Sequence, residues 1–248
     1  MEILPLSEGS FTVDASRQFI PFDPVKDVLT DRPKGSLLVE VQPFAIRTSK
    51  DVLILDTGLG FTLPDGTLQI HANLLQHGIH PAQVTKVLLT HLHKDHAGGI
   101  SKEDRLLKQR GLSFPEATYV VHKNEFEEAL SHPGRSYRMD DVESLKESRQ
   151  LLLVEGEGRL DGGIFYKWTG GHSPWHQVFW IRESDEVVFF GGDVAPQLIQ
   201  LKNRFITKYD ADGRLAADLR TSWWKQGQEE GWTFLFYHDI KTPFYKAK

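Results

Sequence analysis

The sequence predicts a mixed α/β domain in which helices pack over β-sheets. Two observations indicate this fold class. Short apolar runs rich in β-branched and aromatic residues recur along the 248 residues, and longer amphipathic stretches lie between some of them. A third observation concerns organisation, since no repeat, low-complexity tract or long linker divides the chain. We therefore expect residues 1–248 to form a single domain, because a chain of this length can bury a core of its own.

The apolar runs are the candidate strands. Each run is bounded by glycine, proline, aspartate or another charged residue, as is typical of strands that end in turns. We expect strands at Leu37–Val41, Val52–Leu55, Val87–Leu89, Thr118–Val121, Leu151–Val154, Ile164–Trp168, Val178–Ile181, Val187–Phe190 and Phe234–Tyr237.

Four stretches have the pattern of helices. Leu68–Gln76 carries apolar or small residues at positions 68, 72 and 75, which lie on one face of a helix. The other three predicted helices are Asn124–Leu130, Asp140–Arg149 and Arg214–Glu229. Because helices alternate with strands, a layered arrangement of helices over sheets is favoured.

Composition and charge exclude several classes of protein. The chain has no cysteine, so it can form no disulfide, thiolate zinc site or iron–sulfur cluster, and it has no cysteine nucleophile. Lys and Arg number 29 against 34 Asp and Glu, and the net charge of −5 gives no reason to expect binding to nucleic acid or an anionic membrane. The N-terminus does not join a basic segment to an apolar one, and no apolar run could span a bilayer, so we expect a cytoplasmic protein.

A dense cluster of potential metal ligands occupies residues 90–99, directly after an expected strand. His91 and His93 are two residues apart, so in an extended backbone they share a face. Asp95 and His96 are adjacent and diverge unless the chain curls, and the two glycines that follow permit a tight turn. The segment can therefore supply two pairs of ligands to two neighbouring places.

Further ligands are expected at the ends of other strands. His172, Asp193 and His238 each follow an apolar run directly, as the first cluster does. Side chains at like ends of several strands converge on one edge of a sheet, so we expect these three residues to join the first cluster.

Together these ligands resemble those of the metallo-β-lactamase fold superfamily of hydrolases. The resemblance rests on His91-x-His93-x-Asp95-His96, the glycine-flanked His172, Asp193 and the late His238, together with Asp56-Thr57-Gly58, which looks like the Asp-x-Gly that precedes the metal motif in that family. It covers about Leu37 to Asp239. The long segment between Asp193 and His238 looks most like the lactonase and methyl-parathion-hydrolase branch.

The resemblance implies a four-layer αββα sandwich with a di-metal site at one edge of its two sheets. Two divalent metal ions are implied, zinc in first place with iron or manganese as alternatives. Such a pair shares a hydroxide that attacks an electrophile, and the implied substrate is a small ester, lactone, thioester or phosphotriester. The implied ligands are His91, His93 and His172 for the first ion, Asp95, His96 and His238 for the second, and Asp193 as the bridge. Asp95 is also the implied catalytic residue, because it can carry a proton from the hydroxide to the leaving group.

Other functions remain open. An iron-dependent oxidoreductase similar to persulfide dioxygenases would use one iron ion, and the complete second ligand set argues against it. A nuclease of the same fold is disfavoured by the net charge. The Asp193 bridge disfavours a β-lactamase proper, and the intact ligand set disfavours a non-catalytic scaffold.

Several residues near the motifs have expected roles of their own. We expect Asp56 to orient a ligating histidine by accepting its second N–H, and His176 to bond a nearby backbone group. Trp175 is expected in the core, and Lys94 in solvent. We expect Trp223 and Trp224 on an amphipathic helix over a sheet, while the sequence leaves open whether they or Phe205 reach the pocket. The remaining histidines, His71, His77, His80, His122 and His132, are expected to be ordinary surface or core residues.

Two kinds of segment are candidates for contact with a substrate or partner. The apolar, proline-rich stretch Phe19–Pro24, which includes Phe22, is expected either to wall a substrate pocket or to mediate contact in a homodimer. The loops Phe61–Thr67 and Val194–Asp212 are expected to determine specificity for a small-molecule substrate.

Overall fold

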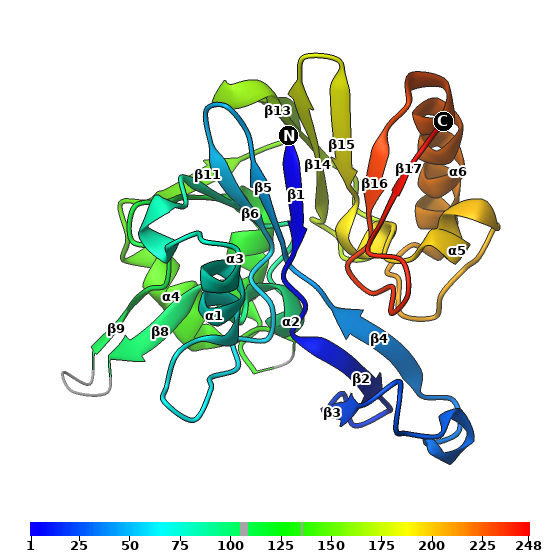
Figure 1. Cartoon of the computed structure of the whole chain (residues 1–248), viewed down its shortest axis with the longest axis horizontal. Helices are drawn as coiled ribbons and strands as arrows, with labels where there is room; N and C mark the ends of the chain where they lie inside the picture. Colours follow the sequence, from blue (N-terminus) through cyan, green and yellow to red (C-terminus); the bar gives the residue numbers. More distant parts are fainter. Residues whose placement is uncertain (105–108, 135) are drawn as a thin grey trace.

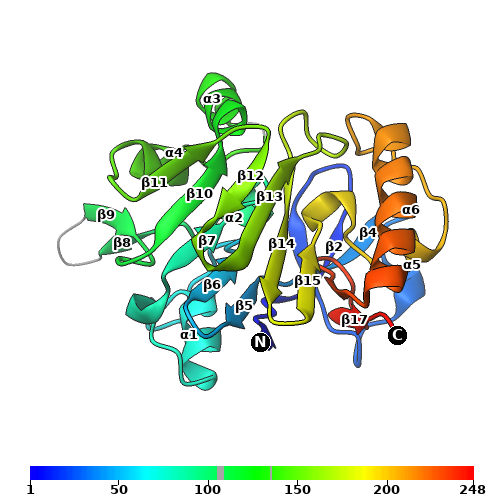
Figure 2. The ribbon, with the colours of Figure 1, turned by 90° about the horizontal axis from the view of Figure 1, so that it is seen from above.

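The computed structural model describes residues 1–104, 109–134 and 136–248, and its centre consists of two six-stranded sheets packed against each other (Figure 1). The first sheet has the order β1 (Glu2–Pro5), β5 (Phe44–Arg47), β6 (Val52–Leu55), β7 (Lys86–Leu88), β10 (Thr118–His122) and β11 (Leu151–Val154). The second has the order β12 (Glu157–Leu160), β13 (Ile164–Trp168), β14 (Gln177–Glu183), β15 (Glu186–Phe190), β16 (Thr233–Leu235) and β17 (Phe244–Lys246). With helices on both outer sides, these sheets form the αββα sandwich that the resemblance implies (Figure 2).

Helices cover the outer face of each sheet. α1 (Gln69–Gln76), α3 (Lys123–Ser131) and α4 (Met139–Lys146) pack on the first sheet, and α5 (Leu198–Lys202) and α6 (Gly213–Glu230) pack on the second. Within the described part of the chain, no helix is both long enough and apolar enough to cross a bilayer.

Alternation along the strands sorts the side chains into three cores. On β15, Phe189 packs on the helix side, whereas Val188 and Phe190 pack between the two sheets. On β10, Val121 packs with the helices and Val120 packs between the sheets. Both faces of these strands are therefore buried, which explains why their sequences are continuously apolar instead of alternating with polar residues.

Smaller elements extend from this sandwich. A three-stranded sheet of β3 (Phe19–Phe22), β2 (Gly9–Val13) and β4 (Leu37–Val41) projects from the body of the molecule (Figure 1), and β8 (Ser101–Asp104) pairs antiparallel with β9 (Gln109–Leu112). The short helical turns are α2 (Lys94–Ala97), η1 (Leu29–Asp31), η2 (Pro81–Gln83), η3 (Asp161–Gly163) and η4 (Gly192–Val194). Two of them, α2 and η4, carry predicted ligands.

Most predicted elements are present, with differences at their ends. β4, β6, β11 and β13 have the predicted bounds, and α1, α3 and α6 agree to within one residue at each end. The strand predicted at Phe234–Tyr237 is wrong at its end, because β16 stops at Leu235. The Phe236 N–H donates to the Pro243 carbonyl over 2.8 Å, and Tyr237 leaves the sheet, where its hydroxyl donates to the Asp95 carbonyl over 2.6 Å.

Candidate metal centre

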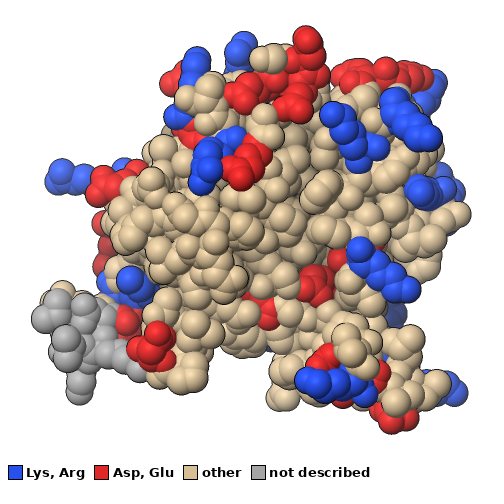
Figure 3. Space-filling model, in the orientation of Figure 1, with Lys and Arg blue, Asp and Glu red and all other residues tan. Residues whose placement is uncertain are grey.

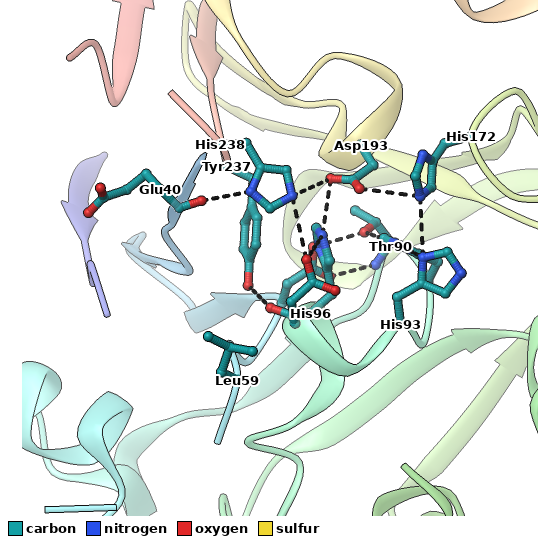
Figure 4. Close-up of polar contacts among 12 residues, drawn as sticks. Glu40, Leu59, Thr90, His93, His96, His172, Asp193, Tyr237 and His238 are labelled. Carbon is teal, nitrogen blue, oxygen red and sulfur yellow. Dashed lines mark hydrogen bonds and ion pairs between the residues drawn. The ribbon is translucent and has the colours of Figure 1, made fainter. Parts of the chain in front are cut away.

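All seven predicted ligands meet at one edge of the sandwich (Figure 4). They come from four places in the chain. The segment after β7 and the turn α2 carry the first four ligands, the loop after β13 carries His172, the turn η4 carries Asp193, and the segment after β16 carries His238. Three sets of their ligand atoms lie within 4.8 Å of one another, namely His91, His93 and His172; His91, His96 and Asp193; and Asp95, His96 and His238.

The first group consists of three histidines. His91 Nε2 lies 2.9 Å from His93 Nδ1, and His172 Nε2 lies 3.2 Å from the same His93 atom. His91 and His93 precede α2 on a non-strand backbone, yet their ring nitrogens meet as the spacing of two predicts. Three imidazoles converging on one point are a set that can bind zinc and leave a fourth position open.

The second group contains Asp95, His96 and His238. Asp95 Oδ2 lies 3.8 Å from His96 Nε2 and 3.7 Å from His238 Nε2. The chain does curl here, because Asp95 and His96 lie in the single helical turn α2, so the two adjacent side chains converge instead of diverging.

Asp193 stands between the two groups. Its Oδ1 lies 3.0 Å from both His96 Nε2 and His238 Nε2, and its Oδ2 lies 3.2 Å from His172 Nε2 (Figure 4). One carboxylate therefore faces both groups with different oxygens, which is the arrangement that a bridging ligand needs.

Asp56 orients two of the histidines, as predicted. The carboxylate is fully buried and accepts from the Thr90 N–H (2.8 Å), the Thr90 hydroxyl (2.8 Å) and His96 Nδ1 (2.7 Å). Because the Thr90 hydroxyl donates to Asp56, it can accept from His91 Nδ1, which lies 3.0 Å away. These bonds fix the proton on Nδ1 of both His91 and His96 and leave each Nε2 lone pair facing the cluster.

Other orienting groups do not follow from the sequence pattern. His238 Nδ1 donates to the Glu40 carbonyl over 2.6 Å, and His172 Nδ1 lies 3.3 Å from Asp210 Oδ1. The buried Glu125 accepts from the N–H of Leu92, between two ligands, and from Ser173, next to a third. Each contact joins residues far apart in sequence, and no local spacing signals them.

The glycines after His96 have a different role from the one predicted. Gly98 has φ −66°, so it makes no left-handed turn. A Cβ at Gly98 would lie 2.4 Å from the Leu59 carbonyl oxygen, and one at Gly99 would lie 2.3 Å from the Thr57 carbonyl oxygen. The glycines are needed because the backbone of residues 57–59 passes directly against the end of α2.

Burial and charge prepare these side chains for a cation. Burial lowers the pKa of His93 to about 3 and that of His91 well below its ordinary value, so both imidazoles are neutral and can donate lone pairs. Burial opposes ionisation of Asp193, but His96 and His238 outweigh it and hold the pKa of this carboxyl well below its usual range. Asp193 in turn raises the pKa of His96, His172 and His238 against the effect of burial, so a bound cation would replace the Nε2 protons that these rings direct at the carboxylate. Neutral His91 and His93 beside an ionised Asp193 are suitable donors for a divalent ion.

Two buried atoms make ion-pair contacts but no hydrogen bond, which supports the same conclusion. His96 Nε2 and Asp193 Oδ1 lie 3.0 Å apart, yet neither has a hydrogen-bond partner among the described residues. Buried polar atoms without a partner are unusual and call for an explanation. The seven residues therefore fit one or two divalent ions.

A cavity of about 590 Å³ opens onto His172, Asp193 and His238. Phe19 and Leu37 of the projecting sheet line one part of it, and the segment from Pro196 to Asp210 lines another. In the orientation of Figure 1, most charged side chains lie around the outline of the molecule and much of the centre of that face is uncharged (Figure 3). The loop expected at Val194–Asp212 is therefore part of the cavity wall, whereas no residue of Phe61–Thr67 is among its lining residues.

The aromatic residues singled out from the sequence divide into two groups. Phe19 and the half-exposed Phe205 line the cavity. Phe22 and Trp223 are buried, Trp224 packs with Phe234 and Tyr245, and none of these three lines it. Phe205 precedes α6 in the chain and is not part of the helix that carries the two tryptophans.

Three further expectations concern single residues. Trp175 packs on the ring of His122, at 5.9 Å and an interplanar angle of 9°, and does not line the cavity. His176 Nε2 accepts from the Asp193 N–H over 3.2 Å, so it bonds a backbone group as predicted and supports the turn that carries Asp193. Lys94 is partly exposed, in keeping with the expectation, and its ammonium donates to the Arg17 carbonyl over 2.9 Å, which ties α2 to the turn between β2 and β3.

Comparison with known proteins gives a family and several relatives. The sequence pattern of the Metallo-beta-lactamase superfamily matches residues 39–237. The N-acyl homoserine lactonase AiiA of Bacillus thuringiensis subsp. kurstaki is 25% identical over 191 residues, which are 69% of this chain and 69% of that protein. The N-acyl homoserine lactonase AttM of Azorhizobium caulinodans is 31% identical over 112 residues, which are 42% of this chain and 38% of that protein. The chain thus spans well under half the length of the AttM relative.

Solved structures share the fold. A probable metal-dependent hydrolase from Staphylococcus aureus superposes with a TM-score of 0.79 at 23% identity, covering 99% of this chain and 91% of that one. AidC, a dizinc quorum-quenching lactonase in complex with a product, superposes with a TM-score of 0.72 at 19% identity, covering 98% and 88%. At these identities the likeness extends to the αββα architecture.

Proposed function

The chain belongs to the metallo-beta-lactamase superfamily, and from that premise we propose that it is a metal-dependent hydrolase of small lactones or esters. The observation that carries the proposal is the convergence of seven histidine and aspartate side chains at the end of a cavity with apolar walls. The relatives named as N-acyl homoserine lactonases support a lactone as the first substrate to test.

The metal ions would be held by the two groups described above. We assign His91, His93 and His172 to one ion, Asp95, His96 and His238 to the other, and Asp193 to both, with zinc as the first metal to test. When bound, such ions lower the pKa of water and supply a hydroxide nucleophile at neutral pH. Since the chain has no cysteine, no thiol competes for this role.

The chain's own residues would orient the ligands and handle a proton. Asp56, the Glu40 carbonyl and Asp210 hold His96, His238 and His172 by their second nitrogens, so that these rings need not reorganise. We assign to Asp95 the transfer of a proton to the leaving group, because its carboxylate lies within the cluster and is partly exposed.

The cavity favours a substrate with an uncharged reactive group and an apolar part. Phe19, Leu37, Val39, Phe205 and Ile206 are among its lining side chains. Burying an apolar chain against such walls stabilises binding by about 25 cal/mol for each Å² removed from water. A lactone with an acyl chain matches this surface better than a highly charged phosphate ester does.

The test combines metal analysis with hydrolysis of N-hexanoyl-homoserine lactone by the purified chain. We expect bound divalent metal, turnover of the lactone and loss of both on chelation. His93→Ala is expected to abolish both, whereas His77→Ala, which removes an exposed histidine, is the matched control and leaves both unchanged. Hydrolysis that survives complete removal of metal would refute the proposal, and a single iron ion without hydrolysis would favour the oxidoreductase alternative.

A further inference from the structure

Arg220 is a buried cation on the inner side of α6. Its side chain is 1% exposed, its Nη1 donates to the Val194 carbonyl over 2.7 Å, and its Nη2 donates to the Phe205 carbonyl. Asp210 interacts with its charge but forms no ion pair with it within 4 Å, and its Nε has no hydrogen-bond partner among the described residues. Burying a guanidinium without a paired anion costs free energy, so its two hydrogen bonds require an explanation beyond helix packing.

The two carbonyls belong to different parts of the candidate site. Val194 follows the bridging Asp193 in the turn η4. Phe205 begins the wall segment 205–209, whose residues all line the cavity and which contains no helix or strand. Arg220 therefore joins the turn that carries a ligand to the wall that faces the substrate.

The other end of the wall segment is also attached to a ligand. Asp210 lies beside His172 Nδ1, and the Ala211 N–H donates to the His172 carbonyl over 3.0 Å. Between these attachments, Phe205, Ile206 and Tyr209 are about half exposed. With the Arg220 bond removed, the wall would keep its attachment at His172 and lose the one at Phe205.

We propose that Arg220 is a positioning residue that holds the wall segment 205–209 at a fixed distance from the Asp193 turn and thereby sets how long an apolar chain the cavity accepts. The substrate part of this proposal rests on the proposed function. A packing role alone would be met by any side chain of similar volume, whereas the proposed role needs two donors in a fixed fork, which only arginine provides.

The experiment compares Arg220→Met and Arg220→Lys with wild type and with Arg214→Met, which removes an exposed arginine from the same helix. Nicking of the metal-loaded protein by chymotrypsin after Phe205 and Tyr209 is followed by mass spectrometry. We expect nicking to be several-fold faster in Arg220→Met than in wild type or Arg214→Met, because the wall is released. Arg220→Lys retains one donor group, so its rate of nicking is expected to lie between those of Arg220→Met and wild type. If Arg220→Met does not fold, Arg220→Lys is compared with wild type in its place.

Kinetics give the second readout. With N-butanoyl- and N-decanoyl-homoserine lactone, we expect Arg220→Met to raise KM several-fold for the longer chain and little for the shorter one. Nicking and a chain-length dependence equal to those of Arg214→Met would overturn the proposal. Proteolysis does not depend on turnover, so it decides the role of Arg220 in the wall even if wild type proves inactive on lactones and the proposed function fails.

Discussion

Replacing Asp56 by asparagine tests whether its carboxylate sets the protonation of His96. The carboxylate accepts from Thr90 through both oxygens and from His96 Nδ1. In Asp56→Asn, one position becomes an NH₂ group that can only donate. If the amide oxygen keeps the Thr90 N–H, the NH₂ faces His96 Nδ1, and the imidazole proton moves to Nε2, where the lone pair for a metal is needed.

The expected magnitude follows from the bond that is lost. A hydrogen bond to a charged group contributes about 1.5–3 kcal/mol. One factor of ten in affinity corresponds to about 1.4 kcal/mol, so metal affinity should fall about 10- to 100-fold, the range typical of groups that orient metal ligands. Burial raises the pKa of Asp56, although His96 opposes this, so the negative charge of Asp56 adds little to the stability of the metal-free protein. Asp56→Asn should therefore change the free energy of unfolding less than it changes metal affinity.

The assay is a competition titration of the metal-free protein against a chromophoric chelator. Asp141→Asn is the matched control, because Asp141 is also a buried aspartate and accepts from Ser101, away from the cluster. We expect one of two metal-binding steps to weaken in Asp56→Asn and neither to change in Asp141→Asn. Two steps of wild-type affinity in Asp56→Asn would refute the assignment of the His96 proton to this carboxylate.

Three further predictions concern other parts of the chain. Asp95→Asn should lower kcat about 10²- to 10⁴-fold in steady-state lactone hydrolysis, and an unchanged kcat would remove Asp95 from proton transfer. Gly60→Ala should lower the free energy of unfolding in urea more than Gly78→Ala does. Both glycines have positive φ (71° and 69°), but a Cβ at Gly60 would overlap the Gly98 carbonyl, whereas a Cβ at Gly78 would meet nothing within 4 Å. Equal losses of stability would contradict the close approach of Gly60 to Gly98. Burial raises the pKa of Glu8 from 4.5 to about 7, so its contribution to stability is fully present below about pH 4.5 and is lost as pH rises through about 7. Glu8→Gln should therefore flatten the pH dependence of unfolding across this window by up to about 3 kcal/mol, and an unchanged slope would show that the group titrates normally.

The sequence predicts the strands that carry a continuous apolar run and fails for those that do not. β6, inside the first sheet, and β11, at its edge, both read as continuous apolar runs and have the predicted bounds. β12, with the sequence Glu-Gly-Arg-Leu, lies at the edge of the second sheet and carries no apolar run, so no local pattern indicates it. The turn α2 has four residues, which is too short for helical periodicity to be visible.

The same distinction separates the ligands from the groups that support them. His91, His93, Asp95 and His96 are predicted because their chemistry is concentrated within six residues and follows a strand. Arg220 is a charged residue in a predicted helix, and its residue type alone would place it in solvent. It is buried because two segments far from α6 present carbonyl oxygens to it, and that arrangement exists only after the sheets and helices have packed. Specificity in this fold is therefore expected to depend on residues such as Arg220 that no motif identifies, while the reactive centre depends on residues that a motif does identify.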